Sequence, residues 1–295
     1  MLRPAPASSS QSNDRGELNV KNLCRTSLST FIRLGSGIAI AAILAGCADF
    51  SAVRTYADDT RKLGTSFSAI ADTPLRLCEA QFMMQEQTRD APVAFRIADV
   101  QARAASDCAP LAKDSTHILS LVTLLDSYSE TLAALADEKL PSYRAELKGL
   151  GEAVDELKTR SGEPVVPPDK AKAVITLGRL VSRLATERVA RGEIRELLEQ
   201  SEAVNATTGA LAWYATSITR PQIDTYLQRA NIAMDAALPR FEKTEPLAVR
   251  MYAVTLLGEQ ERVKKLGTAN EALIAALARH REATLALQAK MDQRK

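Results

Sequence analysis

The sequence has few aromatic side chains, few histidines and few glycines. Only 4% of its 295 residues are aromatic, and it contains one tryptophan and two histidines. His117 and His280 lie far apart and in no H-x-x-H or H-E-x-x-H spacing, so the ligand set of a zinc hydrolase or deaminase is missing. No phosphate-binding loop, dinucleotide fingerprint or nucleophile elbow follows residue 46. We therefore expect a protein that is not an enzyme and that holds no cofactor and no metal.

Two local patterns resemble catalytic or metal sites but have simpler explanations. The run Asp114-Ser115-Thr116-His117 contains the residue types of a catalytic triad, yet consecutive residues at an expected helix start favour capping. Four glutamates recur every third residue with three arginines among them, which favours a solvated face with ion pairs over a carboxylate-bridged metal site. These residues are Glu193, Glu196, Glu199, Glu202, Arg188, Arg191 and Arg195.

The sequence has no excess of one charge sign beyond its first 46 residues. Those residues carry five basic and two acidic side chains, so the rest of the chain has a net charge of −1 against +2 for the whole. No cluster of lysine and arginine is interleaved with aromatic residues. This excludes a nucleic-acid groove and gives no reason for strong attraction to anionic lipid.

Near the amino terminus lies an uncharged run that is too short to span a membrane. Residues 34–48 hold fifteen uncharged side chains, whereas a membrane-spanning helix needs about 20 apolar residues. Basic residues precede the run (Lys21, Arg25 and Arg33) and small residues close it. This order is typical of an export signal that is removed.

The end of this run, Leu44-Ala45-Gly46-Cys47, resembles the lipobox of bacterial lipoprotein precursors. The resemblance implies a diacylglyceryl thioether on Cys47, cleavage before it by signal peptidase II, and acylation of the new amino group with a fatty acid such as palmitate. It also implies contact with the lipoprotein processing and sorting machinery. Because Ala48 rather than an aspartate follows the cysteine, the resemblance favours the outer membrane, on its periplasmic face. The alternative is an ordinary cysteine at the end of a cleaved signal.

The remainder of the chain has the composition of long helices. It is rich in Ala, Leu, Glu, Arg and Gln, and no stretch alternates as a strand would. We expect an all-α fold, an elongated antiparallel helical bundle with long, coiled-coil-like helices. Apolar spacing and proline positions predict helices over residues 49–71, 74–89, 91–106, 114–140, 143–157, 170–219 with a bend near 188–192, 221–239, and 244 to the C-terminus.

The expected organisation has four parts. Residues 1–46 are the signal peptide, 47–160 an N-terminal helical half, 161–168 a Pro-rich turn, and 169–295 a C-terminal long-helix half packed on the first. The sequence of the turn, SGEPVVPP, contains a P-x-x-P spacing that could dock an aromatic groove, although a rigid turn between helices is the simpler interpretation.

Two cysteines remain once Cys24 leaves with the signal and Cys47 takes lipid. Cys78 and Cys108 lie toward the outer ends of two helices expected to fold back on each other, which predicts a disulfide in an exported chain. The alternative is two unpaired cysteines.

The last helix carries an apolar heptad seam from Val249 over about six repeats. Asn270 occupies a seam position, where a polar residue costs stability but fixes register. We expect the part up to Leu277 to pack on the 170–219 helix, and the stretch 280–295 to extend past the bundle and dock a partner helix. The candidate docking residues are His280, Thr284, Leu287 and Met291. The alternative places the whole helix in the bundle.

These features favour a non-enzymatic lipoprotein that acts as a periplasmic scaffold or protein-binding module with an envelope protein as partner. A secreted or membrane-remodelling helical protein is the alternative, against which we set the lack of a spanning stretch after the signal. A further alternative is an enzyme whose site consists of Arg, Tyr and Glu residues that the sequence alone does not assemble. Trp213 is expected to fill bundle core, with an exposed anchor for a partner as its alternative role.

Overall fold

The computed structural model describes residues 50–87, 96–137, 150–186, 193–241 and 246–292. All of them belong to one compact unit, Asp49–Lys295. Helices make up nearly all of these ranges, and no strand occurs in them. The all-α expectation is therefore confirmed.

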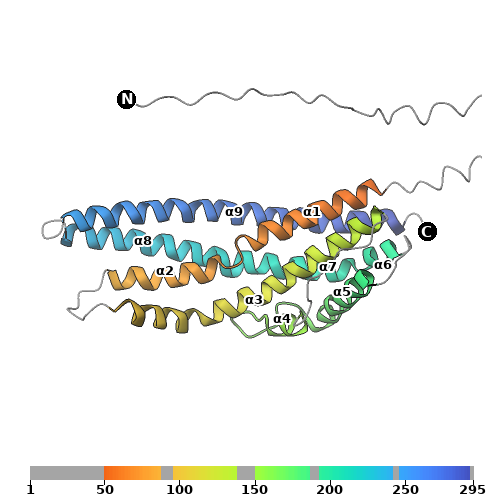
Figure 1. Cartoon of the computed structure of the whole chain (residues 1–295), viewed down its shortest axis with the longest axis horizontal. Helices are drawn as coiled ribbons and strands as arrows, with labels where there is room; N and C mark the ends of the chain where they lie inside the picture. Colours follow the sequence, from red (N-terminus) through yellow and green to blue (C-terminus); the bar gives the residue numbers. More distant parts are fainter. Residues whose placement is uncertain (1–49, 88–95, 138–149, 187–192, 242–245, 293–295) are drawn as a thin grey trace, which may run out of the picture. The chain divides into compact units, whose positions relative to one another are not determined.

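Figure 1 shows the helices coloured in chain order. Their bounds are α1 Ser51–Ser68, α2 Thr73–Gln87, α3 Ile97–Ala136, α4 Leu150–Glu156, α5 Pro168–Thr186, α6 Glu193–Glu199, α7 Ser201–Tyr214, the π-helical turn η2 Ala215–Thr219, α8 Arg220–Phe241 and α9 Pro246–Asp292. At 1.5 Å per residue, the 47 residues of α9 extend over about 70 Å.

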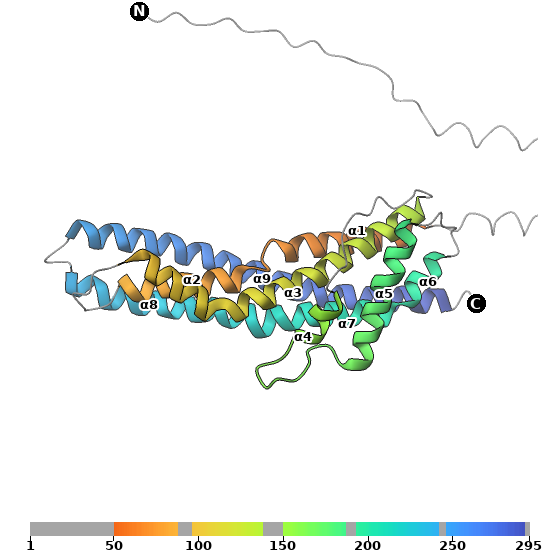
Figure 2. The same cartoon turned by 60° about the horizontal axis from the view of Figure 1, so that its bottom comes forward.

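The bundle has a different helix set at each end. In both views, α2, the start of α3, α8 and the start of α9 lie together at one end (Figures 1 and 2). The other end is formed by α1, α4, α5, α6, α7 and the C-terminal parts of α3 and α9. Helix α9 thus runs through both ends and contacts α1, α6, α7 and α8.

Two apolar clusters form the core. The larger one joins α1, α3, α4, α5, α6, α7 and α9, and the smaller one joins α2, α8 and α9. Leu266 is half-buried and packs against both clusters. The core is therefore continuous along α9.

Helix α3 is longer than the sequence pattern predicted. Helix α3 continues without a break through Pro110 and Asp114, so the expected boundary between 106 and 114, and the capping role of Asp114, are wrong. A proline inside a helix removes one backbone hydrogen bond to the residue four positions earlier. Both Pro110 and Ser106 are exposed, so water can take the freed carbonyl.

The helix expected over 170–219 is divided, and its last part continues past Pro221. Helix α5 packs against α7, so the two are separate helices and not one rod; the expected bend itself lies outside the described residues. From Ser201 to Phe241 the chain stays helical through η2. In η2 the Arg220 N–H donates to the Ala215 carbonyl, and Pro221, which has no N–H to offer, follows at once.

The Pro-rich segment forms a tight turn between α4 and α5. The Val165 N–H donates to the Leu157 carbonyl at 2.9 Å, and the Thr159 N–H to the Glu163 carbonyl at 2.8 Å. Gly162 has φ of 85°, a left-handed conformation that favours glycine. The turn interpretation agrees with this geometry.

One helix of the described chain is long and apolar enough to cross a membrane, contrary to our expectation that no stretch after the signal would be. This helix is α3. Its most apolar window is 61% buried inside the bundle, because α3 supplies much of the larger cluster. Such composition is also typical of the central helix of a water-soluble bundle.

Candidate functional site

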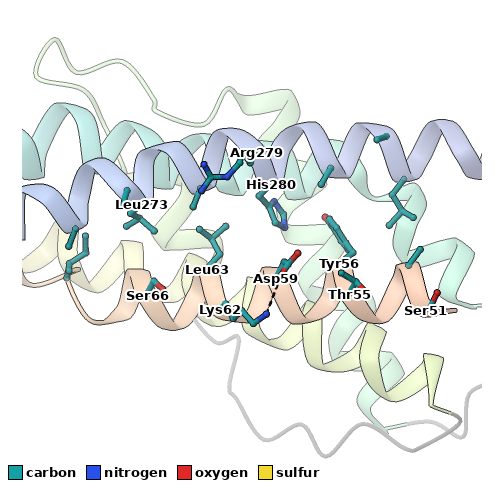
Figure 3. Close-up of a pocket in the computed structure, with 18 residues that line it drawn as sticks. Ser51, Thr55, Tyr56, Asp59, Lys62, Leu63, Ser66, Leu273, Arg279 and His280 are labelled. Atoms are coloured by element: carbon teal, nitrogen blue, oxygen red, sulfur yellow. Dashed lines mark hydrogen bonds and ion pairs between the residues drawn. The ribbon is translucent and has the colours of Figure 1, made fainter.

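The described part of the molecule is hollowed between α1 and the C-terminal half of α9. The groove has a volume of about 940 Å³ and takes its walls from these two helices (Figure 3). Leu63, Ile70, Leu273 and Leu287 make it largely apolar. It is the candidate functional site.

Small side chains are the reason that the groove stays open. Helix α9 presents an alanine at five positions of this wall: Ala269, Ala272, Ala276, Ala283 and Ala286. The wall formed by α1 also contains short side chains, among them Ser51, Ala52, Thr55 and Ser66. Because none of these can reach across the interval between the helices, the two backbones run side by side without filling it.

Four polar side chains close the groove at one level. The Tyr56 and Thr284 hydroxyls are 2.8 Å apart, and Thr60 Oγ1 lies 2.7 Å from His280 Nε2. The rings of Tyr56 and His280 stack with centroids 5.1 Å apart, and Figure 3 shows the two facing each other across the helices. All four residues are buried.

The hydrogen-bond directions in this cluster can be assigned by counting protons. Thr60 donates its hydroxyl proton to the Tyr56 carbonyl, and Thr284 donates its own to the His280 carbonyl. Each threonine can then only accept, so Tyr56 O–H donates to Thr284 and His280 Nε2–H donates to Thr60. His280 therefore carries its proton on Nε2, and Nδ1 is left as a buried acceptor without a partner in the described structure.

Burial sets the charge state of this cluster. Desolvation lowers the pKa of His280 to about 4, with the charge of Asp59 opposing that shift, so the imidazole is neutral at pH 7. Desolvation also raises the pKa of Tyr56, and that of Tyr128, whose ring meets Tyr56 edge-on with centroids 6.5 Å apart. The site holds neutral polar groups, with charged residues only at its rim.

The arrangement suits binding better than catalysis. At the rim, Lys62 pairs with Asp59 at 3.4 Å on the exposed side of α1. Among the residues that the structure describes, no group of three or more His, Cys, Asp or Glu could hold a metal ion. An apolar groove with one buried polar level can recognise a shape and a hydrogen-bonding group.

The residues expected to dock a partner lie on this same stretch of α9. His280 and Thr284 are buried against α1 of their own chain, which agrees with the alternative that this stretch belongs to the bundle. Leu287 is half-buried and lines the groove, so a partner there stays a prediction. The side chain of Met291 lies outside the described residues.

Asn270, the polar residue at a seam position of α9, makes a buried contact with the neighbouring helix, and its role in fixing register stays a prediction. Its side-chain N–H donates to the Ala215 carbonyl at 3.0 Å, the same carbonyl that accepts the Arg220 N–H in the π-helical turn. The residue is buried, and its Oδ1 has no partner among the described residues. Asn270 therefore forms a hydrogen bond with the π-helical turn η2 of the neighbouring helix.

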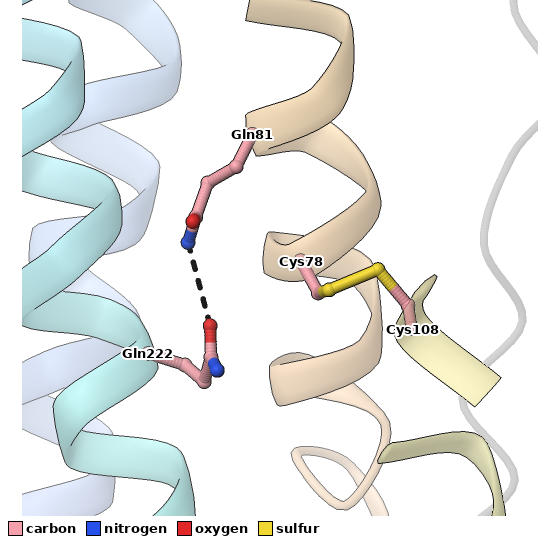
Figure 4. Close-up of a disulfide and its surroundings, with 4 residues drawn as sticks. All are labelled: Cys78, Gln81, Cys108 and Gln222. Atoms are coloured by element: carbon pink, nitrogen blue, oxygen red, sulfur yellow. Dashed lines mark hydrogen bonds between the residues drawn. A yellow bond between two sulfur atoms is a disulfide. The ribbon is translucent and has the colours of Figure 1, made fainter. Parts of the chain in front are cut away.

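Cys78 and Cys108 are joined in a disulfide between α2 and α3, with Cα atoms 6.0 Å apart (Figure 4). On the opposite side of α2, Gln81 donates to Gln222 of α8 at 3.4 Å. Helix α2 is thus held between α3 and α8. Cys47 lies outside the described residues.

In the structure, one residue of each pattern that resembled a catalytic or metal site contacts a charged side chain. His117 lies 3.3 Å from a Glu156 oxygen that also pairs with Lys113 at 2.6 Å. Glu196 pairs with Arg183 of α5 through two bonds of 2.8 and 2.9 Å. Arg188 and Arg191 lie outside the described residues.

Trp213 is half-buried and packs against the larger cluster, in line with a core role.

Comparisons of the chain with protein-family models, with curated proteins and with solved structures found no match. The site is therefore interpreted from its geometry alone.

Proposed function

We propose that this chain is a lipid-anchored helical protein of the bacterial outer membrane that serves, without enzymatic activity, as a periplasmic scaffold or protein-binding module. The observation that carries the proposal is the position of the lipobox. Cys47 lies four residues before Ser51, the first residue of α1, a stretch of at most about 14 Å when extended. A lipid there would tether α1 directly, and α1 forms one wall of the groove.

The occupant that we propose for the groove is a helix of an envelope protein. The alanine wall extends from residue 269 to 286, about 26 Å along α9. Packed helices have interaxial distances of about 8–10 Å that depend on the side chains in the contact, and the small side chains on both walls favour a close approach. An amphipathic helix would lay its apolar face on Leu63 and Leu273, in the helix-in-groove mode.

The anchor is tested by replacing Cys47 with alanine in cells fed labelled palmitate. We expect the label to be lost and the protein to move from the membrane to the soluble periplasmic fraction. Cys78→Ala is the matched control, because it removes a cysteine without touching the lipobox, and it should keep the label. Palmitate incorporation into the Cys47→Ala protein would contradict the anchor.

The groove is tested by photo-crosslinking in cells from both of its walls. A crosslinker at Ser66 and one at Ala286 should capture the same helical segment of one protein, and a crosslinker at the exposed Glu202 of α7 should not. Ala272→Leu should abolish both crosslinks, since the larger side chain fills the groove from an exposed position. Different products from the two walls, or no effect of Ala272→Leu, would rule out a groove-bound helix.

A further inference from the structure

The N-terminal part of α9 carries an apolar face that its own chain leaves uncovered. Leu247, Met251, Val254 and Leu257 are 72%, 65%, 71% and 51% exposed. Their spacing of four, three and three residues places them on one side of the helix. We call this set the α9 stripe. Leu256 and Val263, on the opposite side of the helix, are buried in the smaller cluster. The stripe therefore faces away from the core.

Two opposite charges share that face with the stripe. Arg250 and Glu261 are both exposed, and eleven residues separate them, which is about three turns and roughly 16 Å. Within the described chain neither of them forms an ion pair, whereas Glu259 and Arg262, to the side, pair with each other at 2.8 Å. The face therefore presents an apolar centre with Arg250 toward one end and Glu261, beside the exposed Lys264 and Lys265, toward the other.

From this arrangement we infer that the α9 stripe is a homodimer interface, occupied by α9 of a second copy running antiparallel. A two-fold axis between residues 255 and 256 brings Arg250 of each copy opposite Glu261 of the other. The same register sets Val254 against Leu257. Two opposite charges at the two ends of one apolar face, Arg250 and Glu261, pair with those of a second copy in this orientation. In a parallel pair, Arg250 would lie opposite Arg250 and Glu261 opposite Glu261, and this repulsion would weaken the dimer.

Gly258 makes the close approach possible. A side chain added there would meet nothing within 4 Å in the monomer, so the position is an open notch beside the stripe. In the antiparallel register it leaves room for Met251 of the second copy. A standard interface buries about 800 Å² per partner, so the turns of α9 flanking the stripe also take part.

The first test compares two matched substitutions on the full-length chain by sedimentation velocity. Leu257→Asp should raise the dimer dissociation constant by at least about tenfold, because a charge is buried unpaired in the interface. Leu285→Asp is the control, since Leu285 is exposed to the same degree, 52% against 51%, and lies at the distal end of α9. A monomer at all concentrations, or equal effects of the two substitutions, would overturn the inference.

The second test uses the charges to define the register. Arg250→Glu and Glu261→Arg should each weaken the dimer several-fold, and the double exchange should restore it. In an Arg250→Lys protein, a zero-length carbodiimide should couple Lys at 250 to Glu261 between chains of different isotope label. Within one chain the two are too far apart to be coupled.

The alternative occupant of the stripe is a membrane surface. If the wild-type chain stays monomeric and Leu257→Asp instead abolishes its binding to phospholipid vesicles, the stripe contacts lipid and the dimer is wrong. If the chain dimerises but the double charge exchange fails to restore what each single exchange removes, the antiparallel register is wrong.

Discussion

His280 lies in an environment unlike that of a free side chain. The residue is 6% exposed, and its ring stacks on Tyr56 and is hydrogen-bonded through Nε2. Protonation would place a charge on Nδ1, which has no acceptor within the described structure and no access to water. The neutral ring is therefore a condition for the contact between α1 and α9.

This depressed pKa predicts a loss of stability on mild acidification. The pKa of His280 falls from 6.5 in the unfolded chain to about 4 in the folded one, so between these values the unfolded chain binds the extra proton. The free energy of unfolding should thus be fully present above pH 6.5 and fall by about 3 kcal/mol as the pH drops to 4. Urea titrations at several pH values measure it.

The matched variant for that titration is His280→Gln, which can still donate to Thr60 but has no proton to gain. Its unfolding free energy should show a shallower dependence on pH between 6.5 and 4 than the wild type. Identical slopes for both proteins would mean that another group is responsible.

Asn270 gives a second prediction at this scale. Its amide supplies one of two donors to the Ala215 carbonyl, so Asn270→Ala leaves that carbonyl with one bond and opens a small cavity. We expect the free energy of unfolding to fall by about 1–2 kcal/mol. Asn205→Ala, on a half-buried position of α7, serves as the comparison and should cost less. Equal losses would show that the contact with η2 has no special weight.

The first third of α3 lies outside both apolar clusters of the core. Between Ile97 and Cys108, only Val100, Ala104 and Cys108 are buried, and none of them belongs to either apolar cluster. The disulfide to α2 therefore holds a segment that has little hydrophobic packing of its own.

Removing the disulfide should loosen that segment selectively. In a Cys78→Ala, Cys108→Ala protein, amide hydrogen exchange should accelerate over residues 97–108 and change little over 118–132, where α3 lies in the larger cluster. The chain-entropy model assigns about 3–4 kcal/mol to a loop of this length. Uniform acceleration along α3 would instead indicate that the bridge supports the whole bundle.

The sequence predicted the helices better than it predicted their boundaries and the site. Periodic apolar residues such as those from Ile118 to Leu135 identify a buried helix whatever its partners. The break expected near Asp114 was wrong because solvent tolerates an exposed proline inside a helix, and exposure cannot be read from one position. The π-helical turn was missed because Ala215–Thr219 has no composition of its own.

The groove was missed for a related reason. Alanines at 269, 272, 276, 283 and 286 read as good helix formers, and only the presence of α1 opposite them turns small size into an opening. His280 and Thr284 were singled out correctly as exceptions to the seam. That they lie against α1 of the same chain, beside that opening, required the three-dimensional structure.

On the scale of the whole molecule, α9 connects the two clusters. It places Leu256 in the smaller one and Leu273 in the larger one, and α7, η2 and α8 form a second continuous connection. We therefore expect the two ends of the bundle to unfold together rather than one after the other.

Substitutions in each cluster test that cooperativity. Leu177→Ala in the larger cluster and Leu256→Ala in the smaller one should each lower the free energy of unfolding by about 2–5 kcal/mol. Because the two sites share no contact, their losses should add to within about 0.5 kcal/mol in the double variant. A biphasic denaturation curve for Leu256→Ala alone would show that the ends are independent.

The single indole of the chain has a consequence for how such experiments are observed. Trp213 packs half-buried against the larger cluster, one residue before Tyr214 and two before the π-helical turn. Intrinsic fluorescence excited at the red edge of absorption thus originates from one known point. The emission of the unlabelled protein therefore reports on the surroundings of α7, and it follows the opposite end of the bundle only through cooperative unfolding.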